Sequence, residues 1–167
     1  RGLGDVYKRQ VEIMARTLSA GYSEIAETCL RYARMLTDGE NAHISSPAGT
    51  DLSLSLKGRS GLADTGMVRS PGEFSNLPAG EAYVAPLEGT AWGKLVVDGS
   101  MAGIGKVNSP ITMEVKEGFV VSVSGGPEAE KLEGIMDKYG REARNIAELG
   151  IGLNMSLIHI SEPTRHA

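Results

Sequence analysis

The sequence has few cysteines and few aromatic residues, and it has no long apolar run. A single cysteine, Cys29, leaves no disulfide to form within the 167-residue chain, which fits a reducing compartment such as the cytoplasm. Phe, Trp and Tyr make up 5% of the residues, too few for an aromatic surface that stacks nucleic-acid bases. The formal net charge of −4 comes without basic clusters. We therefore expect a cytoplasmic protein that binds neither nucleic acid nor membrane.

The two ends of the sequence can be encoded by complementary DNA strands. A strand that encodes Gly2–Gln10 has a complement that encodes Ser156–Pro163 over eight consecutive codons. An inverted repeat of this kind is typical of a sequencing-library adapter translated together with its insert, and such segments are excluded from reasoning about the fold. We therefore predict that residues 1–10 and 156–167 are adapter-derived and that residues 11–155 are native.

Histidine is also scarce in the native segment. Residues 11–155 contain only His43, because His159 and His166 lie in the C-terminal segment. A Ser-His-Asp triad would have to use His43, and no G-x-S-x-G nucleophile motif accompanies it. We interpret His43 as structural. Cys29 lies on the apolar side of a predicted helix, which indicates a packed thiol rather than a nucleophile.

The hydrophobic pattern changes its period along the chain. Apolar residues at spacings of three and four predict helices, whereas strict alternation predicts strands. The predicted helices span residues 22–38, 127–139 and 141–149. The predicted strands span residues 52–56, 82–85, 93–97, 111–115 and 119–123. This order favours an α+β fold, a largely antiparallel sheet with flanking helices.

The clearest local prediction is a hairpin formed by the last two of these strands. Its turn falls at Glu117-Gly118, a pair that suits a tight connection between antiparallel strands. Strict alternation then places Val121 and Val123 on the same face as Met113. We expect this face to be buried.

Two glutamates lie in motifs that restrict the backbone. Glu81 ends the segment Asn76–Glu81, with a proline and a glycine before it, and Glu148 lies in Ile146–Gly152, with two glycines after it. A carboxylate on a stiff turn suits a divalent cation that prefers oxygen ligands, and neighbouring glycines allow a close approach of the backbone. From the local residues alone, either glutamate is more often a solvated acid.

These motifs belong to a longer series that occurs in order along the chain. The series comprises Thr50–Leu52, Pro71–Glu81, Ala85–Thr90, Asp98–Ser100 and Ala147–Gly152. Together the motifs resemble the aminopeptidase T-type leucyl aminopeptidases, also called the thermophilic metalloprotease family, over nearly all of residues 11–155. The resemblance implies a partial metalloaminopeptidase catalytic domain, from a hydrolase that releases N-terminal amino acids such as leucine. It also implies that Glu81 and Glu148 are metal ligands.

The resemblance carries further expectations about cofactors and partners. It implies two divalent metal ions, zinc or cobalt with magnesium or manganese as further options, a peptide substrate with a free N-terminus, and a homodimeric parent protein. The family's other ligands, histidines and an aspartate, lie beyond its second glutamate motif, and the sequence ends before them. We therefore expect the 167-residue chain itself to have no aminopeptidase activity.

Two other functions stay open at the level of the sequence. Ring-cleaving dioxygenases that act on dihydroxypyridines share the fold expected here and bind one iron, so the parent protein could be an oxidoreductase. A non-catalytic relative that uses the same sheet for binding or assembly is the second alternative. The number of metal ions and the reaction would separate the dioxygenase from the aminopeptidase, and loss of the downstream histidines and aspartate would favour the non-catalytic relative.

Overall fold

The computed structural model describes residue 15, residue 18 and residues 21–156. The chain divides into two compact units, and each is described by itself. Unit 1 consists of residues 1–36, 60–83 and 150–167, and unit 2 consists of residues 37–59 and 84–149. The predicted adapter segments 1–10 and 156–167 lie outside the described residues, except for Ser156. Their origin, and the extent of the native segment 11–155, stay predictions.

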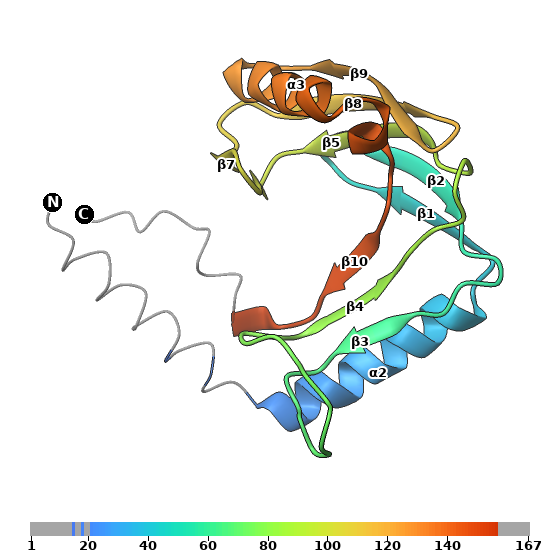
Figure 1. Ribbon diagram of the computed structural model, residues 1–167, viewed down its shortest axis with the longest axis vertical. Helices are drawn as coiled ribbons and strands as arrows, with labels where there is room; N and C mark the ends of the chain where they lie inside the picture. Colours follow the sequence, from blue (N-terminus) through green and yellow to red (C-terminus); the bar gives the residue numbers. More distant parts are fainter. Residues whose placement is uncertain (1–14, 16–17, 19–20, 157–167) are drawn as a thin grey trace, which may run out of the picture. The chain divides into compact units, whose positions relative to one another are not determined.

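Among its residues from 21 onward that the structure describes, unit 1 combines an α-helix with a three-stranded sheet (Figure 1). The helix, α2, spans Tyr22–Asp38. The strands in sheet order are β10 (Leu149–Gly152), β4 (Glu81–Val84) and β3 (Leu62–Asp64). The buried side chains of α2 recur every three or four residues, as expected for a helix with one face on a core. They are Ala26, Cys29, Ala33 and Leu36.

Unit 2 is built on a five-stranded antiparallel sheet in the order β1-β2-β5-β8-β9. The strands are β1 (Asn41–Ser45), β2 (Asp51–Ser55), β5 (Trp92–Val97), β8 (Ile111–Lys116) and β9 (Phe119–Ser124). Helix α3, Pro127–Tyr139, packs on β8 and β9 (Figure 1). A small separate hairpin contains β6 (Ser100–Met101) and β7 (Gly105–Lys106). One face of the large sheet is thus buried, and the other carries polar side chains.

The predicted β8–β9 hairpin forms, but one of its faces differs from the prediction. The register shifts between Glu114 and Val115, so that Val115 lies opposite Val120. Val120 is therefore buried at 3% exposure, whereas Val121 is 52% exposed. The prediction for Val121 was wrong because a bulge inserts one extra residue, and a one-residue slip sends every later side chain to the other face.

The α+β prediction is confirmed, whereas the predicted helix over residues 141–149 is wrong. Only the short 3-10 helix Arg141–Arg144 forms there. Asn145 then bridges to Phe119 of β9, and residues 146–148 connect without regular structure to β10. Strands β3, β6, β7 and β10 were missed. Within the part of the chain that the structure describes, no helix is long and apolar enough to cross a membrane.

Candidate functional site

Glu81 is the first residue of β4 and lies opposite Asp64 of β3 in unit 1. It is half-buried, and the two residues before it, Ala79 and Gly80, are buried. The backbone N–H of Ala79 donates to the hydroxyl of Tyr22 at 3.3 Å, and that of Gly80 donates to the carbonyl of Asp64 at 3.1 Å. Helix α2 and strand β3 together therefore fix the approach of the chain to Glu81.

Asn154 fixes the same turn from the opposite direction along the chain. Its side chain is buried at 5% exposure, and its Nδ2 donates to the carbonyl of Ala79 at 2.8 Å. The backbone N–H of Leu153 donates to the carbonyl of Gly80 at 2.8 Å. A Cβ on Gly80 would lie 2.6 Å from the Cβ of Asn154, and Gly80 has a φ of +123°. Only glycine fits this position without strain.

Gly150 of β10 makes room for the Glu81 carboxylate. A Cβ on Gly150 would lie 2.3 Å from Oε1 of Glu81. The first glycine after Glu148 therefore leaves space for the side chain of Glu81, the other predicted ligand. Glu148 itself is exposed and precedes β10, and the division of the chain assigns it to unit 2. Gly150 of the second motif thus lies beside Glu81 of the first motif. Glu148 precedes Gly150 by two residues in the chain.

Asp64 organises the loop that leads to Glu81. Its Oδ1 accepts a hydrogen bond from the hydroxyl of Ser75 at 2.6 Å, and its Oδ2 accepts one from Nδ2 of Asn76 at 3.0 Å. The hydroxyl of Ser75 in turn accepts the backbone N–H of Gly66 at 2.8 Å. Sequence reasoning missed both Asp64 and Asn154. The signal that was present for Asp64 is its place at the end of an apolar pair, before a glycine-rich loop.

The region around Glu81 is negatively charged, and the neighbouring thiol responds to this charge. Burial raises the pKa of Cys29, and the negative charges of Asp64 and Glu81 raise it further. The side chain is fully buried and forms no disulfide. A thiol is nucleophilic only as the thiolate, so Cys29 is a packing residue rather than a nucleophile. This confirms the sequence interpretation.

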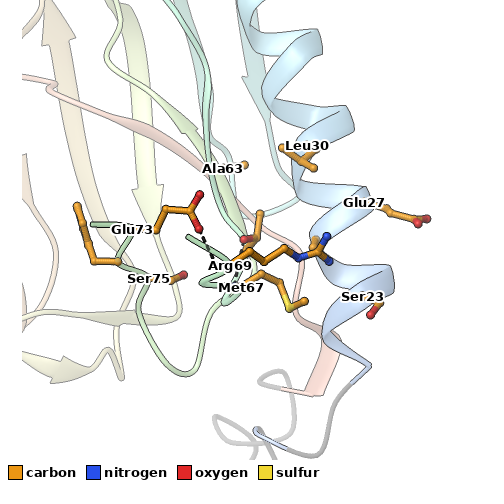
Figure 2. Close-up of a pocket in the computed structure, with 11 residues that line it drawn as sticks. Ser23, Glu27, Leu30, Ala63, Met67, Arg69, Glu73 and Ser75 are labelled. Carbon is orange, nitrogen blue, oxygen red and sulfur yellow. Dashed lines mark hydrogen bonds between the residues drawn. The ribbon is translucent and has the colours of Figure 1, made fainter. Parts of the chain in front are cut away.

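A cavity of about 450 Å³ lies between α2 and the loop that contains Arg69 and Glu73 (Figure 2). The Glu73 carboxylate points back to its own loop and accepts the backbone N–H groups of Arg69 at 2.7 Å and Ser70 at 3.0 Å. These two hydrogen bonds lower the pKa of Glu73. Glu81 is not among the residues that line this cavity. The cavity and the predicted metal ligand are therefore separate features of unit 1.

The residues present do not suffice to hold a metal ion. Among residues 15, 18 and 21–156, no three His, Cys, Asp or Glu side chains are grouped so that they could hold one. A mononuclear iron oxygenase site needs two histidines and a carboxylate, and a catalytic zinc site needs three protein ligands. Glu81 offers one carboxylate for such a set. We therefore derive no reaction step through a metal.

Comparison with known proteins identifies the relatives of the chain. A family model described as NicX, 2,5-dihydroxypyridine 5,6-dioxygenase, matches residues 6–158. The 2,5-dihydroxypyridine 5,6-dioxygenase of Pseudomonas putida KT2440 is 31% identical over 155 residues, which cover 85% of this chain and 41% of the relative. A solved structure of the 2,5-dihydroxypyridine dioxygenase from the same strain matches with a TM-score of 0.74 and 28% identity, over 84% of this chain and 41% of that one. The chain thus spans about two fifths of the length of these relatives.

The solved structure of wild-type AmpT from Thermus thermophilus is a more distant match. It has a TM-score of 0.62 and 20% identity, over 80% of this chain and 34% of that chain. At this identity the likeness shows the fold alone. It supports the α+β fold that the order of helices and strands predicted, and nothing about activity.

The aminopeptidase prediction is therefore wrong. The family model and the P. putida relative both carry the name of a dioxygenase, which contradicts the predicted hydrolase, metallopeptidase and leucine-releasing activity. The peptide substrate was implied only by that resemblance and loses its basis. The match instead favours the first of the two alternatives, the ring-cleaving dioxygenase.

The predicted zinc or cobalt pair loses its support with the aminopeptidase. Zinc has no redox chemistry, whereas a dioxygenase has to activate dioxygen, for which proteins commonly use iron held by histidine and carboxylate. A metal cofactor as such remains consistent with the relatives' reaction. These comparisons do not test the predicted homodimer, which stays a prediction.

Proposed function

The chain belongs to the NicX family, 2,5-dihydroxypyridine 5,6-dioxygenase, and from this membership we propose that it forms part of an oxidoreductase that opens the ring of a dihydroxylated pyridine with dioxygen. In such a reaction one carbon–carbon bond of the ring breaks and both oxygen atoms enter the product. The observation that carries the proposal is the family match over residues 6–158, which includes every residue described from 15 to 156.

We also propose that Glu81 supplies a carboxylate to the metal centre of this enzyme. Its support is structural, because Glu81 is half-buried, lies over Gly150 and follows a turn that is tied to α2, β3 and Asn154. These contacts fix the backbone from which the Glu81 side chain projects, and a metal ligand needs such support. Glu148 is exposed, and its assignment as a metal ligand rests on its motif alone. We therefore consider Glu81 the better supported of the two candidate ligands.

The remaining residues of unit 1 have supporting roles in this proposal. A redox-active metal would relay electrons from the substrate ring to dioxygen, and the chain's own contribution is to hold carboxylates in place. Asp64 fixes the loop before Glu81 through Ser75 and Asn76. Cys29 is fully buried, and burial and the nearby carboxylates raise its pKa, so we assign it to the packing of unit 1 and not to the metal centre.

A chimaera tests both parts of the proposal. Residues 21–156 would replace the matched segment of the P. putida relative, and oxygen uptake with 2,5-dihydroxypyridine would be measured together with iron content. We expect the chimaera to consume one O₂ per substrate molecule. Glu81→Gln should lower this rate by at least about 100-fold. Mutation of a residue that only hydrogen-bonds a metal ligand typically costs roughly 10–100-fold.

Glu130→Gln is the matched control, because Glu130 is an exposed carboxylate on α3 and should leave the rate unchanged. A folded, iron-loaded chimaera without oxygen uptake would contradict the proposed function. A Glu81→Gln chimaera that keeps both its iron and its rate would contradict only the role of Glu81.

A further inference from the structure

Three side chains form a row across the open face of the sheet in unit 2. Ser53 of β2 lies directly opposite His43 of β1 on one side and Trp92 of β5 on the other. Directly opposite residues in antiparallel strands point to the same face. His43 and Ser53 are exposed, and Trp92 is 49% exposed. The row therefore consists of two rings with a small side chain between them.

The dimensions of this row suit one flat ring. Neighbouring strands are about 4.8 Å apart, which places His43 and Trp92 roughly 9.6 Å apart at the backbone. A ring that contacts both walls at about 3.5–4.0 Å on each side needs roughly 7–8 Å between them. A cavity of about 560 Å³ lies at this place, and its lining includes all three residues together with Asn41, Ser55 and Thr90. We call the space between His43 and Trp92, with Ser53 as its floor, the cross-strand slot.

The walls of the cross-strand slot are held in place. Nε2 of His43 is 2.8 Å from Oδ1 of Asp51, a carboxylate that can only accept, so this nitrogen carries the proton. This contact between two exposed side chains orients the imidazole. Trp92 stands on a strand that is paired on both sides, with β2 and with β8. Sites built on strands keep their geometry better than sites on loops.

The floor offers a polar group that the described residues leave unused. Within residues 21–156 the Ser53 hydroxyl, the Asn41 amide and the Trp92 indole N–H make no side-chain hydrogen bond. Ser55 and Thr90 are already engaged, with the carbonyls of Glu40 and Leu87 respectively. A ring that stands on its edge in the slot would bring one ring atom or substituent to the Ser53 hydroxyl. A hydroxyl group or a ring nitrogen could bond there.

We propose that the cross-strand slot is a binding site for a single flat aromatic ring that carries a hydroxyl group or a ring nitrogen. His43 and Trp92 contact its two faces, and Ser53 bonds its polar edge. None of these residues is a predicted metal ligand, and binding needs neither a metal nor turnover. The site is thus independent of the proposed dioxygenase reaction, and its test can fail without any consequence for that proposal.

Trp92 makes the test direct, because it is the single tryptophan of the chain. The ¹⁵N-labelled 167-residue protein has one indole N–H signal, and its shift would be followed while 3-hydroxypyridine is added. We expect a saturable shift, as a ring stacked on the indole changes its magnetic environment. Cyclohexanol, which has a hydroxyl but no flat ring, should produce no saturable shift. The same holds for glucose, which distinguishes an aromatic site from a sugar site.

Variants of the slot residues locate the binding. Ser53→Leu fills the slot and should abolish the saturable shift. Ser122→Leu places the same side chain at an exposed position of β9 and should keep the dissociation constant within about twofold. His43→Ala removes one wall without filling the slot, and loss of one ring–ring contact should weaken binding by about two- to tenfold. Circular dichroism of each variant verifies that the fold is intact.

Three outcomes would overturn the proposal. The first is the absence of a saturable shift with 3-hydroxypyridine on the folded wild-type chain. The second is unchanged binding in both Ser53→Leu and His43→Ala, which would place the ring elsewhere on Trp92. The third is saturable binding of glucose without binding of 3-hydroxypyridine.

Discussion

At the scale of single residues, two glycines control the surroundings of the Glu81 carboxylate in different ways. Gly80 has a left-handed backbone, and a Cβ there would meet the Asn154 Cβ at 2.6 Å. Gly150 carries no such backbone restriction, and a Cβ there would meet only the end of the Glu81 side chain, at 2.3 Å. A carboxylate on a flexible side chain can move away, whereas a buried turn cannot. The two positions should therefore respond differently to the same substitution.

We expect Gly80→Ala to destabilise the protein by about 1–3 kcal/mol, since it imposes backbone strain and a clash in a buried turn. Gly150→Ala should change stability by less than about 1 kcal/mol, because the lower entropy of the unfolded chain offsets the displacement of Glu81. Urea unfolding of both variants provides the measurement. Equal losses in the two variants would contradict the assignment of Gly150 as a residue that makes room for Glu81.

The sequence identified Glu81 but not the residues that hold it, and the reason is distance along the chain. Pro78 and Gly80 precede Glu81 directly, so a local motif reveals a restricted turn. Asn154 bonds a carbonyl that lies 75 residues earlier. No periodicity or motif in one sequence reports such a pairing. The same limit applies to His43, whose interpretation as structural omitted its position opposite Ser53.

At the scale of elements, the loop before β4 is held by carboxylates that accept backbone and side-chain hydrogen bonds. Glu73 closes its tip through Arg69 and Ser70, and Asp64 holds its base through Ser75. The loop is therefore ordered by charge-assisted hydrogen bonds, which are stronger than neutral ones. Its order should depend on the protonation of Glu73.

The folded protein lowers the pKa of Glu73, chiefly through the Arg69 and Ser70 backbone N–H groups. The stabilising effect of this carboxylate is thus present above its ordinary value of 4.5 and is lost as the pH falls from there through the folded value. We expect the amide proton shifts of Arg69 and Ser70 to titrate below pH 4.5. Glu73→Gln should remove this titration.

Glu128 offers an internal control for this titration in unit 2. Its pKa is also lowered, through a side-chain hydrogen bond with Asn108. The Asn108 amide shift should titrate unchanged in Glu73→Gln. Titration of Arg69 and Ser70 that persists in the variant would show that another group orders the loop tip.

Elements with a strong period were predictable, and short or interrupted ones were not. Helix α2 and the β8–β9 hairpin follow from spacing and from the Glu117-Gly118 turn. Strand β3 has three residues, which is too short for alternation to be recognised. The bulge after Glu114 breaks the alternation itself. In both cases the deciding interaction is a ladder with a partner strand, which local residues do not encode.

At the scale of the whole molecule, the sequence indicated the fold class correctly and the family wrongly. The motif series consists mainly of glycines, prolines and the acids beside them, and these residues specify turns and close backbone approaches. The TM-score of 0.62 to AmpT shows that the fold is shared with that protein. Fold and turns do not determine which reaction a site performs. The residues that separate a dioxygenase from a hydrolase are the remaining ligands, and the described residues contain no complete set.

The division into two units raises the question of whether they unfold together. The chain passes between the units four times, and α2, β4 and β10 each extend across a boundary. Unfolding of either unit would therefore disrupt elements that the other shares, which favours a single cooperative transition. Each unit contains a unique reporter, Cys29 in unit 1 and Trp92 in unit 2.

We expect the two reporters to give the same urea midpoint. Cys29 is fully buried, and its raised pKa disfavours the thiolate, so iodoacetamide at pH 8 should react slowly until unit 1 opens. Trp92 fluorescence reports the sheet of unit 2 in the same samples, and a short cysteine peptide gives the rate for a free thiol. Alkylation that precedes the fluorescence change would show that unit 1 unfolds alone, and the shared elements would then not couple the two units.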